Sequence, residues 1–277
     1  MRAAIDIGSN SIRLLSEDGL KRSVITKLAD GIEKSSRLSA AGVEATIATL
    51  KEYAALVRGY EIIPFATEAV RRAQDGAEFI ARVEREVGIR INLLSPEDEA
   101  RLALKGATKK PGPVTVCDLG GGSLEIISAT DGVNPEYSKS LPLGVVVLKN
   151  KFSGDYTRAI DCCPSLVSEF GEIKKYPVVF LGGSACNIAA GLMNLPYYDA
   201  KKVDGCTVTL KDLDGFLPVL TSDKLPVLRP VCAKRADTIA YGAIMIAAVL
   251  NHIGVTEFTV SDSSNLEAAL SAASPLK

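Results

Sequence analysis

The chain has 277 residues, 47% of them hydrophobic, and its 32 Lys and Arg residues nearly balance 33 Asp and Glu residues. This length exceeds the roughly 100 to 200 residues of one domain, so two domains sharing a cleft are expected. Because the overall charge is close to zero, nothing in the balance indicates nucleic acid or a membrane as a partner, and any polyanion must be bound by local groups.

The cysteine and histidine content narrows the chemistry further. Six cysteines occur without CxxC spacing, and Cys162 and Cys163 are adjacent, which favours reduced core thiols over a metal site or disulfide framework. The single histidine, His252, excludes an HExxH protease and a multi-histidine zinc site, and it is expected at the end of an apolar helix. The chain opens without a charged-then-apolar leader, and its longest apolar run, Ala240 to Leu250, is shorter than the roughly 20 residues of a membrane span. A cytoplasmic protein is therefore expected.

Hydrophobic periodicity and turn signals predict the same order of elements twice, on either side of a Pro- and Gly-containing linker at Thr108 to Pro113. In the first half we expect strands at 2–7, 11–16, 21–28, 61–66 and 89–94, and helices after Ser39, at 67–72, at 76–87 and after Ser95. In the second half we expect strands at 114–118, 123–129, 133–141, 177–181, 207–210 and 258–261. We expect helices near 143–149, after Asp155 with a break at Pro164, at 185–193, from Thr209 or Lys211 onward, at 233–250 and at 266–273.

Three antiparallel strands followed by a helix begin a ribonuclease-H-like unit. The predicted fold class is therefore α/β, with one ribonuclease-H-like domain at 1–112 and another at 113–277. Hinges are expected at Lys109 to Pro113 and in the helix that starts at Ala233.

The stretch VTVCDLGGGSLEI, Val114 to Ile126, predicts a hairpin that binds phosphate. Its turn, Gly120, Gly121 and Gly122, has no side chains, so backbone N–H groups can approach an anion closely. Three polar side chains face the same place as these N–H groups: Asp118, Ser123 and Glu125.

The start of the chain, AIDIGSNSIRLL, repeats this pattern when Asp6 is aligned with Asp118. Gly8 then matches Gly120, and the neighbouring residues match in turn: Ser11 falls on Ser123, and Arg13 on Glu125. A Gly-rich turn on its own is often only a tight hairpin, but no Walker or Rossmann motif is present, and the repetition favours two phosphate loops. Two opposed carboxylates, Asp6 and Asp118, would suit Mg²⁺, which takes one or two carboxylates together with phosphate oxygens and water.

Another acid, Glu99, is expected to face inward. In SPEDEARLALKGA, Ser95 can cap a helix and the acids in its first turn are favoured by the helix dipole. At 100° per residue, Glu97, Asp98 and Arg101 share a polar arc, whereas Glu99 lies with the apolar residues of the opposite side. From the helix alone, Glu99 is either a general base or a buried acid satisfied by a backbone amide.

Taken together, these motifs resemble the exopolyphosphatase and guanosine pentaphosphate phosphohydrolase family, within the actin, Hsp70 and sugar kinase superfamily. The resemblance covers nearly the whole chain, and the matching segments are Asp6–Leu15, Arg37–Ser39, Ala66–Ala73, Glu97–Ala107, Asp118–Ile126, Ser140–Leu148, Leu181–Ala190 and Arg235–Gly242. It implies two actin-like domains, Mg²⁺ as cofactor, and inorganic polyphosphate or a guanosine polyphosphate as partner, with a homodimer left open.

The resemblance also implies a role for each matching residue. Glu99 would be the general base that activates water, and Arg71 would bind the phosphate that is removed. The remaining implied sites are Asp6, Asp118 and Glu125 for the metal, Gly8, Ser9, Asn10 and Ser11 for the first phosphate loop, and Gly120, Gly121, Gly122 and Ser123 for the second.

The chain also departs from the family pattern. Glu68 and Asp75 stand where the family often has uncharged polar residues, and Leu124 and Val147 where it often has Thr and Arg. The helical C-terminal domains of the longer enzymes are also expected to be absent, which leaves the preferred substrate length open.

Three functions follow as hypotheses. The first is a Mg²⁺-dependent hydrolase that releases terminal phosphate. The second is a polyphosphate or alarmone sensor with little turnover. The third is an ATP-dependent kinase, suggested because Gly182-Gly183-Ser184 resembles the adenosine loop of the superfamily.

Overall fold

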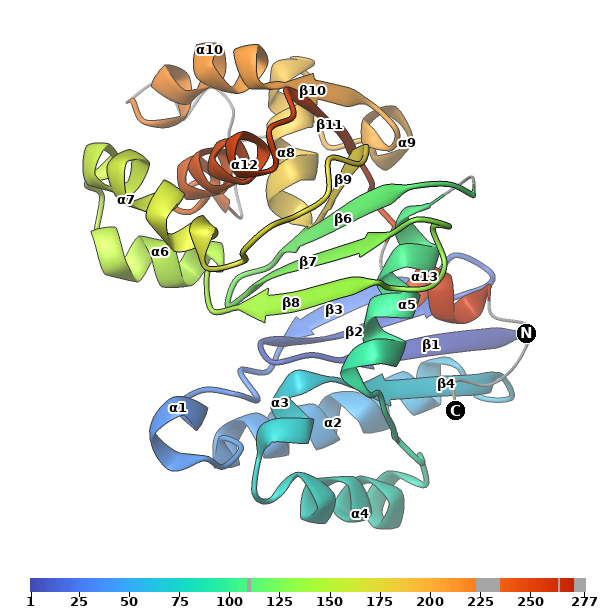
Figure 1. The fold of residues 1–277 in the computed structure, drawn as a ribbon. Helices are drawn as coiled ribbons and strands as arrows, with labels where there is room; N and C mark the ends of the chain where they lie inside the picture. The colour runs from blue at the N-terminus through green and yellow to red at the C-terminus, as the bar shows by residue number, and fades with distance from the viewer. Residues whose placement is uncertain (109–110, 223–234, 264, 272–277) are drawn as a thin grey trace. The chain divides into compact units, whose positions relative to one another are not determined.

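The computed structural model of the chain describes residues 1–108, 111–222, 235–263 and 265–271 (Figure 1). The chain divides into two compact units. Unit 1 comprises Met1–Gly106 and Asn265–Lys277, and unit 2 comprises Ala107–Ser264. Each unit is built on its own sheet and has its own hydrophobic core.

Unit 1 contains a sheet with the strand order β3-β2-β1-β4-β5. Strands β1 to β3 form an antiparallel meander, and β4 and β5 then add in parallel beside β1, which is the ribonuclease-H-like order. Its elements are β1 (Arg2–Ile7), β2 (Ser11–Ser16), β3 (Lys21–Ile25), α1 (Ile32–Ser35), α2 (Ala40–Leu56), β4 (Glu61–Ala66), α3 (Glu68–Arg72), α4 (Gly76–Val87), β5 (Asn92–Leu93), α5 (Pro96–Ala107) and α13 (Asn265–Leu270).

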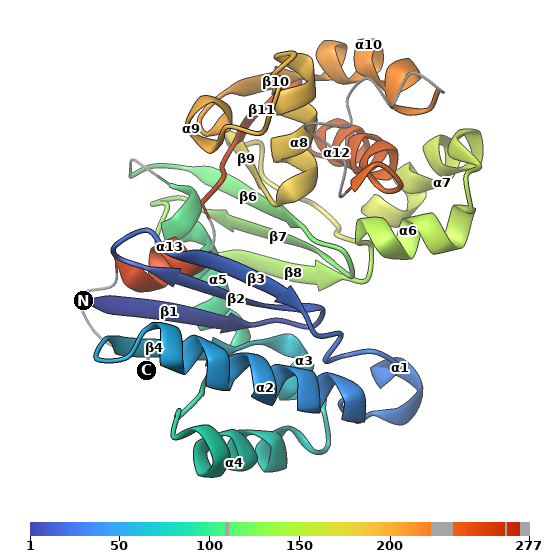
Figure 2. The same cartoon turned by 180° about the vertical axis from the view of Figure 1, so that it is seen from behind.

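The alternation of side chains along β1 explains how this sheet is covered on both faces. Ala3, Ile5 and Ile7 point to one face and belong to one apolar cluster with side chains of α2 and α4. Figure 2 shows α2 and α4 on the same side of this sheet. Ala4 points to the other face and packs in a cluster with side chains of α5 and α13. Because side chains alternate with a period of two, Asp6 lies on the same face as Ala4, which is the face that α5 covers.

Helices α2 and α5 begin where the sequence predicts. The Ser39 Oγ accepts the Gly42 N–H at 3.3 Å and caps α2. The Ser95 Oγ accepts the Asp98 N–H at 3.1 Å, and Pro96 is the first residue of α5. These caps fix the first turn of α5, and with it the rotation of that helix about its axis.

Unit 2 repeats the arrangement with one extra antiparallel edge strand, in the order β10-β11-β9-β6-β7-β8. Strands β6, β7 and β8 form the meander, while β9 and β11 run parallel to β6. Its elements are β6 (Val114–Leu119), β7 (Leu124–Ala129), β8 (Tyr137–Leu141), α6 (Val145–Phe152), α7 (Tyr156–Ser168), β9 (Val178–Leu181), α8 (Gly183–Leu192), α9 (Ala200–Val203), β10 (Thr207–Thr209), α10 (Leu210–Leu220), α12 (Ile239–Ile253) and β11 (Glu257–Val260).

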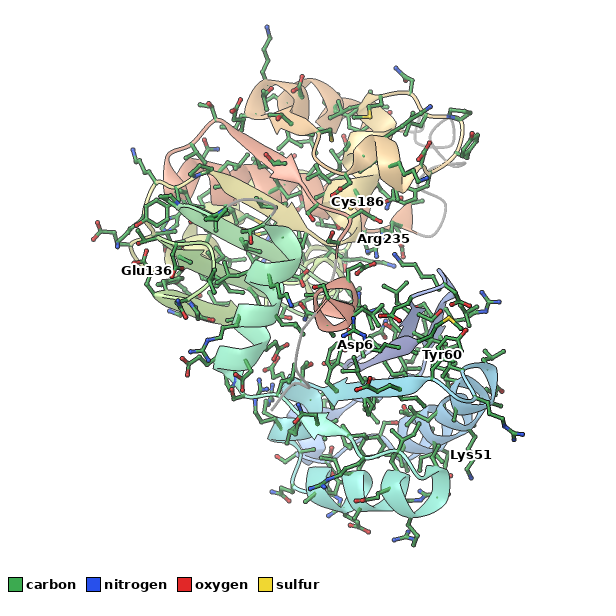
Figure 3. The ribbon with its side chains drawn as sticks, turned by 90° about the vertical axis from the view of Figure 1, so that its right-hand side faces the viewer. Asp6, Lys51, Tyr60, Glu136, Cys186 and Arg235 are labelled. Atoms are coloured by element: carbon green, nitrogen blue, oxygen red, sulfur yellow. The ribbon has the colours of Figure 1, made fainter. Side chains whose placement is uncertain are left out.

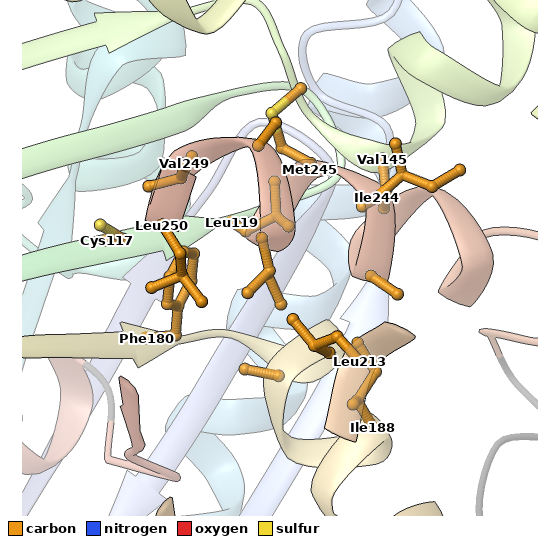
Figure 4. Close-up of a cluster of buried hydrophobic side chains, with 14 of the residues drawn as sticks. Cys117, Leu119, Val145, Phe180, Ile188, Leu213, Ile244, Met245, Val249 and Leu250 are labelled. Atoms are coloured by element: carbon orange, nitrogen blue, oxygen red, sulfur yellow. The ribbon is translucent and has the colours of Figure 1, made fainter. Parts of the chain in front are cut away.

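The core of unit 2 is centred on α12. This helix is buried around nearly its whole circumference, and Met245, Val249 and Leu250 pack with Cys117 and Phe180 of the sheet (Figure 4). His252 lies in its last turn, as predicted, with Nε2 2.7 Å from the Gly171 carbonyl oxygen. The described cysteines, Cys117, Cys162, Cys163, Cys186 and Cys206, are free thiols as expected, and Cys232 lies outside the described residues.

The structure corrects the predicted domain boundaries. The second domain was expected to run to residue 277, but α13 belongs to unit 1, because Leu266 and Ala269 complete the apolar cluster around Ala4 and Phe65. The first boundary falls after Gly106 rather than at 112, at the end of α5. Parts of both predicted hinges, Lys109–Lys110 and residues 233–234, lie outside the described residues.

Several predicted elements also differ in length or continuity. Strand β3 ends at Ile25 instead of residue 28, and β5 is limited to Asn92–Leu93. Helix α7 continues through Pro164 instead of breaking there, and the Asp155 side chain caps its start as predicted. Within the described part of the chain, no helix combines the length and apolar character that a membrane crossing requires.

Candidate active site

The second phosphate loop, residues 120–122, has its carbonyl oxygens and its N–H groups on opposite sides. The N–H groups of residues 144–146 donate to the carbonyl oxygens of residues 120–122 at 2.9 to 3.2 Å. In a trans peptide the following N–H points away from its carbonyl, so the N–H groups of 121–123 face the other side. None of these three N–H groups has a hydrogen-bond partner among the described residues. Three successive N–H groups of this kind form an anion-binding concavity.

The close packing of this loop requires glycine at position 144. A Cβ added to Gly144 would lie 2.3 Å from the carbonyl carbon and oxygen of Gly121. The Gly144 N–H also donates to the Gly122 carbonyl oxygen, at a distance of 3.2 Å, which holds the two segments together. A helix was predicted near residues 143–149, and α6 begins at Val145, directly after this close contact.

Two carboxylates lie beside this loop on adjacent strands. Asp118 on β6 is directly opposite Glu125 on β7, so both side chains are on one face of the sheet. The Ser140 Oγ on β8 donates to Glu125 Oε1 at 2.8 Å. A Cβ added to Gly182, whose φ is +93°, would lie 3.2 Å from Asp118 Oδ1. The loop that follows β9 therefore passes next to the Asp118 carboxylate.

These two carboxylates fit the needs of Mg²⁺. The described residues contain no group of three or more His, Cys, Asp or Glu side chains that could hold a metal ion. Mg²⁺ needs no such group, since it binds through one or two carboxylates and takes its other ligands from water and phosphate oxygens. Asp118 and Glu125 supply that number, and like charges directly across a sheet are unfavourable unless a cation lies near them.

The first phosphate loop, Gly8–Ser11, has the same construction in unit 1. The Ser9 carbonyl oxygen accepts the Ala29 N–H at 2.9 Å, and the Asn10 carbonyl oxygen accepts N–H groups from Thr26 and Lys27 at 3.0 Å each. The N–H groups of Ser9 and Asn10 have no partner among the described residues. The two loops therefore share their hydrogen-bonding design as well as their sequence pattern.

Asp6, at the end of β1, is paired with an arginine. It is directly opposite Arg13 on β2, and Arg13 Nε donates to Asp6 Oδ2 at 3.1 Å, with a second bond from Nη2. Asp6, labelled in Figure 3, is 4% exposed. A buried carboxylate needs a charged or hydrogen-bonding partner, and Arg13 supplies both. A metal role for Asp6 remains a prediction, and Arg13 is a site residue that the sequence analysis did not single out.

Glu99 and Arg71 meet on the face of the sheet that carries Asp6. The Glu99 Oε2 lies 3.4 Å from both Nη1 and Nη2 of Arg71, and the Arg71 Nη1 also donates to the Leu94 carbonyl oxygen. The Glu99 side chain is 28% exposed and that of Arg71 27%. The partner of the Glu99 carboxylate in the described chain is thus a guanidinium and not a backbone amide.

The pKa of Glu99 is strongly perturbed. Burial raises it from the usual 4.5 to about 7, and the charges of Asp6 and Glu68 push in the same direction, while Arg71 opposes them. A pKa near neutrality is the property required of a general base. The inward orientation predicted from helix periodicity therefore places this acid in the environment that such a base needs.

The acids that depart from the family pattern have local partners. Asp75 accepts the Leu38 N–H at 3.0 Å and lies 3.4 Å from Arg37 Nε, so it joins the segment before α2 to the start of α4. Glu68 forms an i,i+4 ion pair with Arg72 at 3.6 Å. Asp75 therefore has a structural explanation, whereas Glu68 acts on the site by raising the pKa of Glu99.

Arg235 is a second residue that the sequence analysis did not single out as part of the site. A Cβ added to Gly183, the first residue of α8, would lie 2.2 Å from Arg235 Nη2, so the guanidinium packs directly on this glycine. Arg235 and Cys186 are both labelled in Figure 3. The positive charge of Arg235 lowers the pKa of the Cys186 thiol, against the larger effect of burial, which raises it. Since Arg235 is about fifty positions away in sequence, no local pattern could have placed it there.

The topology and the paired loops define the class of protein: a two-unit ribonuclease-H-like α/β protein with two matching hairpin loops, each of which carries unpaired N–H groups among the described residues. The chain belongs to the Ppx/GppA phosphatase family, whose model matches residues 9–270.

Individual relatives agree with this assignment. The chain is 30% identical to the Ppx/GppA family member of Aquifex aeolicus, with a TM-score of 0.82 over 97% of this chain and 95% of that one. It is 27% identical to the bifunctional 3-dehydroquinate synthase/phosphatase of Fusobacterium nucleatum, over 98% of this chain and 46% of that protein. It is 33% identical to exopolyphosphatase 1 of Mycobacterium tuberculosis, over 54% of this chain and 48% of that one. The chain thus spans about half the length of these two curated relatives, whereas exopolyphosphatase 2 of the same organism, at 28% identity, is matched over 96% of both chains.

Proposed function

We propose that this chain is a Mg²⁺-dependent phosphohydrolase that releases the terminal phosphate of inorganic polyphosphate or of guanosine pentaphosphate. The observation that carries the proposal is Glu99, a carboxylate with a pKa near 7 held beside Arg71 on the face of Asp6. Membership of the Ppx/GppA phosphatase family and the similarity to exopolyphosphatases support it.

Each site residue has a role in the proposed reaction. Ionised Glu99 accepts a proton from a water molecule, whose oxygen attacks the terminal phosphorus. The phosphoanhydride bond breaks, inorganic phosphate leaves, and the shortened polyphosphate keeps the electrons of the broken bond. Arg71 and the unpaired loop N–H groups donate to the phosphoryl oxygens on which charge develops. Asp118 and Glu125 would hold Mg²⁺, which neutralises phosphate charge when bound, and a metal role for Asp6 stays a prediction.

The test is an assay of phosphate release with a matched pair of variants. Polyphosphates of graded length and guanosine pentaphosphate are compared with and without Mg²⁺. Glu99→Gln should lower kcat by about 10² to 10⁴, the usual contribution of a general base, and keep substrate binding. Glu97→Gln is the control, because Glu97 lies on the same helix, is 64% exposed and pairs with Arg101. Wild-type turnover in Glu99→Gln would refute the assignment of the base.

A sensor with little turnover is the second candidate function. It is favoured by Glu68, an acid close enough to Glu99 to act on its pKa, because the family often has an uncharged polar residue there and an added negative charge weakens the attraction for a polyanion. The same assay separates the two functions, because a sensor binds tripolyphosphate tightly and releases no phosphate at pH 8, where the base is ionised. Cytoplasmic location and a homodimer remain predictions.

A further inference from the structure

A serine hydroxyl on β8 bonds one of the two carboxylates beside the second phosphate loop. Ser140 pairs across the strands with Glu125 of β7, which in turn pairs with Asp118 of β6. The three side chains therefore form one row on a single face of the sheet. The Ser140 Oγ donates to Glu125 Oε1 at 2.8 Å, within the usual range of an O–H···O bond. The outer member of the row thus holds the carboxylate of the middle one.

The backbone around Ser140 fixes the position of this hydroxyl. The next residue, Leu141, pairs with Leu124 and packs against the core of unit 2. A few residues further on, the N–H groups of residues 144–146 bond the carbonyl oxygens of the second phosphate loop. The segment that carries Ser140 is therefore attached both to β7 and to the loop. A carboxylate that is bonded to Ser140 is held in register with that loop.

Unit 1 contains the same row with different bonds. Its members are Asp6, Arg13 and Ser23, at the matching positions of β1, β2 and β3. The Arg13 guanidinium bonds Asp6, and the Ser23 hydroxyl has no hydrogen-bond partner in the described part of the chain. A guanidinium has no acceptor for a hydroxyl, whereas a carboxylate has several. The outer serine is therefore bonded only in the unit that presents two carboxylates on one face.

We propose that Ser140 is a positioning residue of the metal site, where its hydroxyl orients the Glu125 carboxylate toward Mg²⁺. The inference rests on the proposed function and extends it to a residue that acts through Glu125. The last torsion of a glutamate side chain has a broad energy minimum, so the carboxylate rotates easily unless a partner holds it. A bond to one oxygen fixes this rotation before the cation arrives, and the hydrogen-bond partners of metal-bound carboxylates contribute to affinity in this way.

The experiment uses matched variants of Ser140. Ser140→Thr keeps the hydroxyl, Ser140→Val has nearly the shape of threonine without it, and Ser140→Ala removes it with the least added volume. The control is Ser138→Ala, because Ser138 is an exposed serine on the same face of β8 that pairs with Ile127 and bonds no carboxylate among the described residues.

Three quantities are measured for each protein. Electron paramagnetic resonance gives the Kd of Mn²⁺, which takes the same oxygen ligands as Mg²⁺, on protein without substrate. Thermal unfolding without metal reports any change in the fold. Phosphate release from inorganic tripolyphosphate is followed at graded Mg²⁺ concentrations.

We expect Ser140→Ala and Ser140→Val to raise the Kd of Mn²⁺ about tenfold. Ser140→Thr should stay within about threefold of wild type, since it keeps the bond to Glu125, and Ser138→Ala should match wild type. No variant should unfold clearly earlier than wild type. A higher Mg²⁺ concentration should restore full kcat in Ser140→Ala and Ser140→Val, because Glu99 and Arg71 are unaltered.

Two results would overturn the inference. If Ser140→Ala and Ser140→Val keep the Kd of Mn²⁺ within about twofold of wild type, or if Ser140→Thr loses as much affinity as Ser140→Val, the hydroxyl does not position Glu125. The proposed function then stands as long as wild type releases phosphate in the presence of Mg²⁺. If wild type binds Mn²⁺ but releases no phosphate, the proposed hydrolase fails and the Kd values still decide the role of Ser140. If wild type binds no Mn²⁺, both proposals fail.

Discussion

Replacement of Glu99 by glutamine should remove activity and stabilise the fold, and the size of the second effect follows from the pKa. Burial raises the pKa of Glu99 from 4.5 to about 7. Below pH 4.5 the folded and unfolded states both keep the proton, and the group costs nothing. Between pH 4.5 and 7 the unfolded chain loses the proton first, so stability falls as the pH rises. Above pH 7 the full cost of the ionised form, about 3 kcal/mol, is present.

Glutamine resembles protonated glutamate in shape and carries no charge, so Glu99→Gln avoids this cost. At pH 8 the variant should be about 3 kcal/mol more stable than wild type, and at pH 4 the two should be nearly equal. Chemical denaturation at pH 4, 6 and 8 measures the difference. The control, Glu97→Gln, should show no such pH dependence, because Glu97 is largely exposed on the same helix.

The activity of the wild-type protein should rise with pH as Glu99 loses its proton, over the same range in which its stability falls. With a pKa of about 7, roughly one-tenth of Glu99 is ionised at pH 6, half at pH 7 and nine-tenths at pH 8. The kcat/KM should therefore rise about fivefold from pH 6 to 7 and less than twofold from pH 7 to 8. A flat profile over this range, or a Glu99→Gln variant that is less stable than wild type at pH 8, would refute the reasoning.

Three further predictions test the loops, the metal ligands and the corrected boundary. Gly144→Ala adds a methyl group 2.3 Å from the Gly121 backbone, so thermal unfolding should reveal a loss of about 1 to 3 kcal/mol, together with weaker phosphate binding; an unchanged melting temperature would contradict the close contact. Glu125→Gln should raise the Mg²⁺ concentration for half-maximal activity about tenfold or more, and an unaltered requirement would exclude Glu125 as a ligand. Leu266→Ala removes most of a residue that is 1% exposed, so the free energy of unfolding, measured by urea denaturation, should fall by about 2 to 5 kcal/mol. A loss below about 0.5 kcal/mol would show that α13 does not complete the cluster around Ala4.

Features that depend on local chemistry were predictable from the sequence. Ser39 and Ser95 cap their helices, and Glu99 lies on the inward side of α5 because a helix rotates by a fixed angle per residue. The pairing of Asp6 with Arg13 is also implicit in the sequence, since both residues are equally distant from the turn of the hairpin. The repetition of one motif in the sequence is sufficient to predict both loops.

Features set by tertiary contacts were not predictable in this way. Strand β3 ends at Ile25 because the next N–H groups, from Thr26 and Lys27, bond the Asn10 carbonyl oxygen instead of continuing the ladder. Helix α13 follows the last strand of unit 2 but packs in unit 1, and its short apolar sequence gives no indication of which core it joins. The position of Arg235 over Gly183 likewise depends on chain segments that are distant in sequence.

The two hairpins have one architecture and opposite charge patterns. In unit 1 the position opposite the first aspartate is Arg13, which neutralises Asp6 within the protein. In unit 2 the same position is Glu125, and two carboxylates lie across adjacent strands. Unit 2 thus presents two carboxylates on one face, the number that Mg²⁺ takes from a protein, whereas the carboxylate of unit 1 is paired with an arginine. The Mg²⁺ requirement is therefore expected to depend on Asp118 and Glu125 more than on Asp6, and Asp6→Asn should change the Mg²⁺ dependence of activity less than Asp118→Asn does.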